Sequence, residues 1–192
     1  KNNLSLILFF IIVFLVNNSF PEENLKSKAI KYLKELKFFS ASFIQDDLSS
    51  IAEGKVFVGE NRIRVDYEKP TKILIILDEN KAMYYDYELE EDEFFDPSGT
   101  SAKFFFDIFK KPDFFGDSDI ASQENYLVLS KSGKNEKIDF TIKVFFENNP
   151  FLLRKAELFF EDKFLVMSIF NHRYNETFDK NFFKLINPSF FN

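Results

Sequence analysis

Cysteine and tryptophan are absent from this sequence of 192 residues, which also contains only five glycines, six prolines and one histidine. The absence of cysteine excludes disulfides, cysteine-ligated zinc and thiol chemistry. The low glycine and proline content excludes collagen-like and low-complexity chains. Aromatic residues are abundant, with 29 phenylalanines and seven tyrosines, and this excludes a disordered chain. Because such a phenylalanine content fits an AT-rich genome, the positions of these residues are more informative than their number.

Basic residues are fewer than acidic ones. The 25 lysines and arginines stand against 31 aspartates and glutamates, which gives a formal net charge of −6. The sequence has no long basic stretch, and we therefore expect no nucleic-acid partner.

The elements of a catalytic site are also missing from the sequence. The single histidine, His172, lies in a polar segment at a predicted strand end, and no G-x-S-x-G motif supplies a nucleophile. Asp66, Asp86 and Asp139 fall on the polar faces of predicted strands, where carboxylates are ordinarily solvated. No glycine-rich phosphate loop is present. The sequence therefore predicts a protein that is not an enzyme, with no catalytic residue and no cofactor.

An acidic run at residues 90–93 is the one candidate for a metal site. Its spacing does not match that of a calcium-binding loop. We therefore expect a solvated loop and no metal at this position.

The N-terminal region has the pattern of an export signal. Lys1 begins a short basic segment, residues 4–16 are apolar apart from Ser5, and a polar segment follows. This apolar run of 13 residues is shorter than the ~20 residues that span a bilayer, and it fits the core of a secretory signal. We expect a signal peptide at residues 1–19 and a single domain at residues 20–192, with an uncleaved N-terminal anchor as the alternative. An exported chain without cysteine indicates a bacterial periplasm.

The domain is predicted to begin with an amphipathic helix. Lysines occupy one side of this segment, and apolar residues recur at helical spacing on the other: Leu25, Ala29, Tyr32, Leu33 and Leu36. A helix with this pattern must pack its apolar side on another apolar surface.

After this helix the pattern changes to alternation with a period of two, which is typical of strands. The clearest example is Ile63, Val65 and Tyr67, with polar residues between them. Residues 73–77 form a continuous apolar run, which predicts a strand covered on both faces. Residues 182–186 are predicted to form the last of about nine or ten antiparallel strands, which would curl into a barrel or half-barrel.

A second, shorter helix is predicted to end at Lys110, with Ser98 or Thr100 as its cap. It is apolar nearly all round, because it contains Phe104, Phe105, Phe106, Ile108 and Phe109. Such a helix must be clamped between two surfaces or must face a lipid-like ligand.

Motifs along the whole domain resemble those of one protein family. They are Leu33-x-x-Leu36-x-x-Phe39-x-Ala41-Ser42-Phe43-x-Gln45, Gly54-Lys55-Val56-Phe57-Val58, Asn61-Arg62-Ile63-Arg64-Val65-Asp66-Tyr67-Glu68-Lys69-Pro70, Asp78-Glu79-Asn80-Lys81 with Met83-Tyr84-Tyr85-Asp86, and Phe182-Phe183-Lys184-Leu185-Ile186-Asn187-Pro188. In their order and spacing they resemble the LolA family, the periplasmic carriers of outer-membrane lipoproteins.

This resemblance implies a mainly β fold of the α+β class, an incomplete antiparallel β-barrel with helices covering its concave hydrophobic face. It also implies a hydrophobic cavity, between the barrel and the helices, for the acyl chains of a lipoprotein. Carriers of this family take acylated lipoproteins from an inner-membrane ABC lipoprotein-release complex and pass them to an outer-membrane lipoprotein receptor, without ATP or cofactors of their own. We expect a periplasmic chaperone of this kind, acting as a monomer.

The residues expected to bind lipid combine clean strand alternation with a place in these motifs. They are Val56, Val58, Ile63, Val65, Tyr67, Met83 and Tyr85 on the strands, Leu33 and Leu36 facing them from the first helix, and Phe104, Phe105 and Ile108 on the candidate lid.

The sequence departs from the family pattern at the residues tied to the lid. The family usually has an arginine and a proline where this sequence has Gly59 and Glu60, and that arginine is tied to the lid and to cargo release. Arg62 and Arg64 are both candidates to replace it. The family's tryptophan in the same strand is Val65 here.

A regulatory module of the same fold that senses envelope lipoproteins or lipids is the alternative function. Such sensors usually carry a second domain, for which the residues after the predicted signal leave no room. The carrier function is therefore favoured.

Overall fold

The computed structural model describes residues 22–135 and 138–191. The strands are β1 (Phe39–Asp46), β2 (Ile51–Val58), β3 (Ile63–Lys69), β4 (Ile73–Leu77), β5 (Ala82–Asp86), β6 (Glu91–Phe95), β7 (Asp119–Ser122), β8 (Tyr126–Asn135), β9 (Ile138–Asn148), β10 (Phe151–Phe160) and β11 (Lys163–Arg173). The helices are α1 (Glu22–Glu35), α2 (Ser101–Lys110) and the short 3-10 helices η1 (Pro112–Phe115) and η2 (Pro188–Phe191). The predicted signal peptide, residues 1–19, lies outside the described residues.

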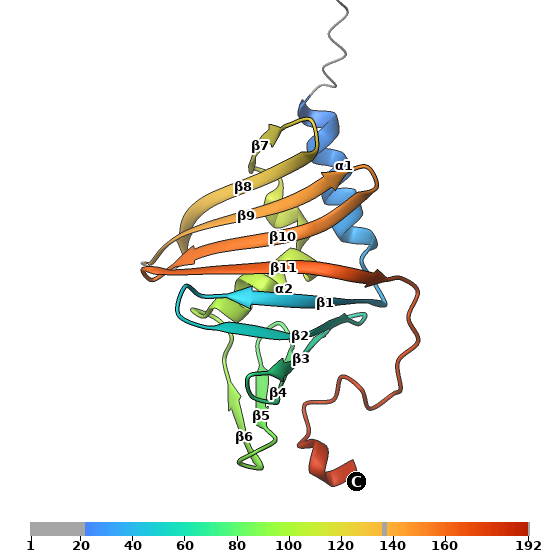
Figure 1. The fold of residues 1–192 in the computed structure, drawn as a ribbon, viewed down its shortest axis with the longest axis vertical. Helices are drawn as coiled ribbons and strands as arrows, with labels where there is room; N and C mark the ends of the chain where they lie inside the picture. Colours follow the sequence, from blue (N-terminus) through green and yellow to red (C-terminus); the bar gives the residue numbers. More distant parts are fainter. Residues whose placement is uncertain (1–21, 136–137, 192) are drawn as a thin grey trace, which may run out of the picture.

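All the described strands belong to one antiparallel sheet in the order β6-β5-β4-β3-β2-β1-β11-β10-β9-β8-β7. The sheet is open, with β6 and β7 as its edges, and both α-helices lie behind it in the view of Figure 1. The predicted fold, a mainly β incomplete barrel with helices on one face, is confirmed. Among the described residues, no helix has the length and apolar character needed to cross a bilayer.

The amphipathic helix α1 packs its apolar side as its pattern predicts. Ala29 and Leu33 are completely buried, and α1 contacts β8, α2 and η1. The ring of Tyr32 packs edge-on against Phe146, with centroids 5.8 Å apart. Burial of a leucine side chain stabilises a fold by about 1.5–3 kcal/mol, so this side of α1 holds the helix on the sheet.

The second helix, α2, is buried nearly all round because it packs between the sheet and the other helices, which is the first of the two alternatives that its pattern left open. It contacts α1, η1 and β10. The Phe104 ring lies 4.8 Å from that of Phe140 and 5.1 Å from that of Phe160. The Phe109 ring stacks on Phe39 at 6.5 Å.

Two separate apolar clusters lie on opposite faces of the sheet. The larger lies on the helix side and contains the buried residues of both helices and most strands. The smaller lies on the other side and consists of Leu74, Ile76, Met83 and Tyr85, with Leu185 packed on it. The prediction that residues 73–77 are covered on both faces is therefore confirmed.

Leu185 belongs to the C-terminal segment, residues 174–191, which follows β11 and ends in η2 (Figure 1). The predicted strand at residues 182–186 is wrong, because this segment contains turns and η2 but no strand. The carbonyl oxygens of Phe182 and Phe183 accept hydrogen bonds from the side chains of Arg64 in β3 and Arg62 just before it, and not from the backbone of a neighbouring strand.

The acidic run also differs from its prediction. Residues 91–95 are the edge strand β6, paired with β5, and not a loop. The side chains of residues 91–94 are exposed. The charges therefore indicated exposure to solvent correctly, but an edge strand can be solvated along its length while its backbone pairs on one side.

Candidate functional site

A cavity of about 100 Å³ lies between α2 and the middle strands of the sheet. Its lining is apolar except for Gln45, Tyr67 and Ser101, and consists of Gln45, Val56, Ile63, Val65, Tyr67, Ile75, Leu77, Ser101, Ala102, Phe105, Phe109, Leu165 and Met167. We call this space the inner cavity.

The register of the strands brings the inner-cavity residues to one face. Val56 pairs with Val65, and Ile63 pairs with Leu77. Because paired residues in an antiparallel sheet point to the same face, these side chains all turn toward α2. From the opposite side α2 contributes Phe105 and Phe109, one helical turn apart.

Two of the three polar side chains of the inner cavity, Tyr67 and Gln45, bind each other. The Tyr67 hydroxyl donates a hydrogen bond to Oε1 of Gln45, 2.9 Å away. Burial raises the pKa of Tyr67 to about 12, so the phenol stays neutral. The cavity therefore offers a ligand apolar contact and no fixed charge.

Of the residues predicted to bind lipid, five line the inner cavity: Val56, Ile63, Val65, Tyr67 and Phe105. Five more belong to the same apolar cluster without lining the cavity: Leu33, Leu36, Val58, Phe104 and Ile108.

The grouping of Met83 and Tyr85 with these residues is wrong. Met83 pairs with Ile76 and Tyr85 with Leu74, and all four point to the face away from the helices. Tyr84, next to them, pairs with Ile75 on the cavity face.

The sequence analysis missed several residues of the inner cavity: Gln45, Ile75, Leu77, Ser101, Ala102, Phe109, Leu165 and Met167. A signal existed for Phe109, which follows Phe105 by one turn, and for Ile75 and Leu77, which lie in the apolar run. Leu165 and Met167 had none, because they reach the site only through the pairing of β11 with β1.

The end of α2 is fastened to two turns of the sheet by lysine side chains. Lys110 donates hydrogen bonds to the carbonyl oxygens of Gly59 and Glu60, in the turn between β2 and β3. Lys111 pairs with Glu79, in the turn between β4 and β5, with Nζ 2.5 Å from Oε1. Burial, with a smaller contribution from the charge of Lys37, lowers the pKa of Lys110 to about 8.

The two arginines predicted as lid or release residues do not contact α2 through any described hydrogen bond or ion pair. Arg62 pairs with Asp78 (2.7 Å) and donates to the carbonyl oxygen of Phe183 (3.1 Å). Arg64 pairs with Asp66 (2.8 Å) and donates to the carbonyl oxygen of Phe182 (3.1 Å).

Strand alternation explains this correction for Arg64. It stands between Ile63 and Val65, and therefore points away from α2 toward the C-terminal segment. The cation that joins α2 to the β2–β3 turn is instead Lys110, which belongs to α2 itself. Its acceptors are at Gly59 and Glu60, the two positions where the sequence departs from the family pattern.

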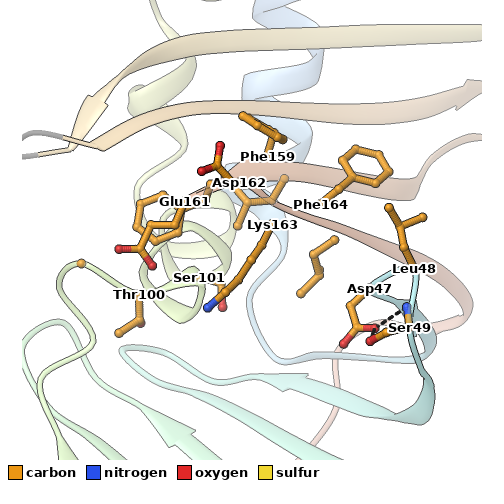
Figure 2. A pocket seen from close by; sticks show the side chains of 14 residues that line it. Asp47, Leu48, Ser49, Thr100, Ser101, Phe159, Glu161, Asp162, Lys163 and Phe164 are labelled. Atoms are coloured by element: carbon orange, nitrogen blue, oxygen red, sulfur yellow. Dashed lines mark hydrogen bonds between the residues drawn. The ribbon is translucent and has the colours of Figure 1, made fainter.

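A second and larger cavity, of about 730 Å³, opens beside the start of α2. It is bounded by the β1–β2 turn, residues 99–101 and the β10–β11 hairpin (Figure 2), and we call it the outer pocket. Ser101 and Leu165 line both cavities, so the two adjoin. Hydrogen bonds from Ser49, with others from Ser50, lower the pKa of Asp47 at this rim to about 2.

His172 occupies a structural position. Its Nε2 lies 2.7 Å from the carbonyl oxygen of Leu153, and its ring packs on Phe39 with centroids 5.6 Å apart. Burial lowers the pKa of this imidazole. Among the described residues, no cluster of three or more histidine, aspartate or glutamate side chains is arranged to hold a metal ion.

Comparison with protein families gives one match: the family described as "Outer membrane lipoprotein carrier protein LolA" matches residues 34–186. No curated protein matches the chain.

Three solved structures are similar to the chain at very low sequence identity, and the first of them, with a TM-score above 0.5, shares its fold. An uncharacterized conserved protein from Thermus thermophilus is similar with 7% identity and a TM-score of 0.54, over 85% of this chain and 94% of that one. A chain of the Pseudomonas aeruginosa MucA/MucB complex has 8% identity and a TM-score of 0.49, over 85% of this chain and 61% of that one. LprF from Mycobacterium bovis has 10% identity and a TM-score of 0.43, over 83% of this chain and 96% of that one.

Proposed function

The chain belongs to the LolA family of outer membrane lipoprotein carrier proteins, and on this premise we propose that it binds the acyl chains of lipoproteins and carries them across the periplasm. In this proposal residues 1–19 are the export signal and residues 20–192 the carrier domain. Lipoproteins arrive from an inner-membrane ABC lipoprotein-release complex and leave to an outer-membrane receptor. The protein binds and releases cargo and catalyses no reaction.

The observation that carries the proposal is the inner cavity, whose two walls belong to separate elements. Side chains of the sheet form one wall, and Ala102, Phe105 and Phe109 of α2 form the other. An acyl chain inserted there would separate α2 from the sheet. The helix can therefore act as a lid on the site.

The energetics of acyl chains explain the need for such a site. Each methylene removed from water gains about 0.8 kcal/mol, so a free lipoprotein anchor does not cross an aqueous space. A carrier must bury the chains and still release them. Apolar contacts without a fixed charge, as in the inner cavity, meet both requirements because no single strong bond has to break.

The fastening of α2 supports the lid role. Lys110 is bound to backbone carbonyl oxygens, and these bonds can be replaced by water when the helix moves. The pair between Lys111 and Glu79 is exposed and contributes little. The closed position of α2 is therefore held by apolar packing together with a few exchangeable polar contacts.

The test is to purify the protein from the periplasm of a bacterium that makes it, and to identify bound species by native mass spectrometry. We expect acylated lipoproteins, and none when the acylated cysteine of a cargo is replaced by serine. Recovery of an empty protein, together with correct lipoprotein sorting after its depletion, would falsify the proposal.

A further inference from the structure

The inner cavity is too small to hold an acyl chain by itself. Its volume is about 100 Å³, whereas an engineered protein cavity of ~150 Å³ binds a molecule only as large as benzene. The outer pocket, at about 730 Å³, lies in the ~300–1,000 Å³ range of ordinary ligand sites. A bound chain must therefore extend from the first space into another, and the outer pocket adjoins it at Ser101 and Leu165.

Polarity rises along this path. At the inner end the lining is apolar, with Val65 and Met167. Leu158 and Leu165 continue the apolar lining into the outer pocket, which Leu48, Phe159, Phe160 and Phe164 also line.

Polar and charged residues, which the inner cavity has few of or lacks, join these apolar side chains in the outer pocket: Asp47, Ser49, Thr100, Ser101, Glu161, Asp162 and Lys163. Figure 2 shows Lys163 extending from the β10–β11 turn toward the start of α2. An amphiphile bound along this gradient has one favourable direction, because burying an ester or amide group without a hydrogen bond is unfavourable.

We propose that the outer pocket is the port of the carrier and a second subsite for its cargo. The ends of the acyl chains lie under α2 beside Val65. The chains pass Ser101 and Leu165, and the ester, amide and peptide groups of the lipoprotein anchor lie at the rim near Lys163. This inference rests on the proposed carrier function and adds the direction in which cargo is bound.

The experiment uses the absence of cysteine from the sequence, which lets one introduced cysteine carry one fluorescent label. Three variants place a bimane label at the rim (Lys163→Cys), in the inner cavity (Ala102→Cys) and on the opposite face of β11 (Ser168→Cys, the control). The probes are two forms of a synthetic dipalmitoylated cysteinyl-seryl-tetralysine lipopeptide. One carries a nitroxide quencher at its peptide end, and the other carries it at the end of an acyl chain.

We expect the peptide-end nitroxide to quench the label at position 163 more than that at position 102. The chain-end nitroxide should show the reverse order, and neither should quench position 168 strongly. If the chain-end nitroxide quenches position 102 but the peptide-end nitroxide does not quench position 163, cargo enters elsewhere. The assignment of the outer pocket as the port is then wrong, although the carrier function stands. If neither lipopeptide binds any variant, the carrier function itself fails, and the port with it.

A substitution at the junction of the two cavities gives a second measurement. Leu165→Glu places a charge in the path of the chain and should weaken lipopeptide binding by at least tenfold. Ser168→Glu adds the same charge on the other face of β11 and should leave the affinity unchanged. Circular dichroism and thermal unfolding establish that both variants fold. Equal affinity of the two folded variants would contradict the proposal that the outer pocket is the port.

Discussion

The side-chain amine of Lys110 is hydrogen-bonded to the backbone carbonyl of Gly59, and this contact joins the end of α2 to the turn between β2 and β3. A hydrogen bond from a charged group contributes about 1.5–3 kcal/mol, which is enough to bias a lid between two positions. The bond needs no particular side chain on the sheet, because its acceptor is backbone.

Removing this contact should speed the exchange of cargo. Lys110→Met keeps the aliphatic length and loses the hydrogen bonds, and the dissociation rate of a dipalmitoylated lipopeptide should rise about tenfold, since tenfold corresponds to ~1.4 kcal/mol. Lys111→Met, which loses only the exposed pair with Glu79, is the matched control and should change the rate little. Stopped-flow fluorescence measures both. Equal rates in the two variants would show that Lys110 does not hold the lid.

The same lysine should make stability depend on pH in a definite direction. Burial lowers the pKa of Lys110 in the folded protein to about 8, against 10.5 for an unperturbed lysine. Between these values the unfolded chain binds more protons than the folded one, so stability rises with pH across this window.

Relative to Lys110→Met, the wild-type protein should therefore gain about 1 kcal/mol in free energy of unfolding between pH 7 and 10, less than the full shift implies because the group is partly solvated. Urea denaturation at each pH measures this difference. A difference between the two proteins that stays constant with pH would contradict the assignment.

Substitutions on the two sides of the sheet should differ in their effects on lipopeptide binding and on stability. Met83 is completely buried under the C-terminal segment, and Met83→Ala should lower the free energy of unfolding by about 2–5 kcal/mol without changing lipopeptide affinity. Phe105 is half-buried in the wall of the inner cavity, and Phe105→Asn should weaken binding at least tenfold with a smaller loss of stability. Denaturation and binding titrations on the same preparations test the pair. Weakened binding in a folded Met83→Ala protein would show that Met83 contributes to the proposed lipid site after all.

Arg64 should anchor the C-terminal segment. Its guanidinium lies 4.3 Å from the centre of the Phe182 ring and also neutralises Asp66, whose pKa is raised by burial. Arg64→Ala should cost about 2 kcal/mol, because it leaves a half-buried carboxylate without its partner. It should also expose the segment to cleavage by trypsin at Lys180 and Lys184.

The double variant Arg64→Ala, Asp66→Ala provides the control for this anchor. It should recover part of the lost stability, since the unpaired carboxylate is gone, but the segment should remain sensitive to trypsin. If the single variant resists trypsin as well as the wild-type protein does, other contacts hold the segment.

Local pattern predicted the sheet well where one face is apolar and the other polar. Ile63, Val65 and Tyr67 alternate with charged residues, and this fixes the phase of β3 toward the helices. In β4 residues 73–77 are all apolar, so the sequence does not show which of them face the helices. It therefore could not show which face Met83, on the next strand, belongs to. The covering by Leu185, which makes both faces of β4 apolar, comes from a segment far along the chain.

The candidate site could be predicted only where its lining residues lie on elements that follow one another in the sequence. Val56 to Phe105 lie on consecutive elements, and their motifs and periodicity indicated them. Leu165 and Met167 lie on the last strand, and no pattern near them in the sequence indicates that β11 pairs with β1. The contact of Lys110 with the β2–β3 turn was missed for another reason: its acceptors are backbone carbonyl oxygens, which every residue has, so no residue type in the sequence indicates them.

The pairing of β1 with β11 also has a consequence for the order of folding. Strands β1 to β6 pair with their sequence neighbours, and so do β7 to β11, so each half of the sheet can form through local contacts. The seam between the halves closes a loop of more than a hundred residues, and such long-range closure is slow. Because β3 and β11 both line the inner cavity, this cavity forms only when the seam closes. In the proposed carrier function, the chain therefore cannot take up cargo before its last strand has paired with β1.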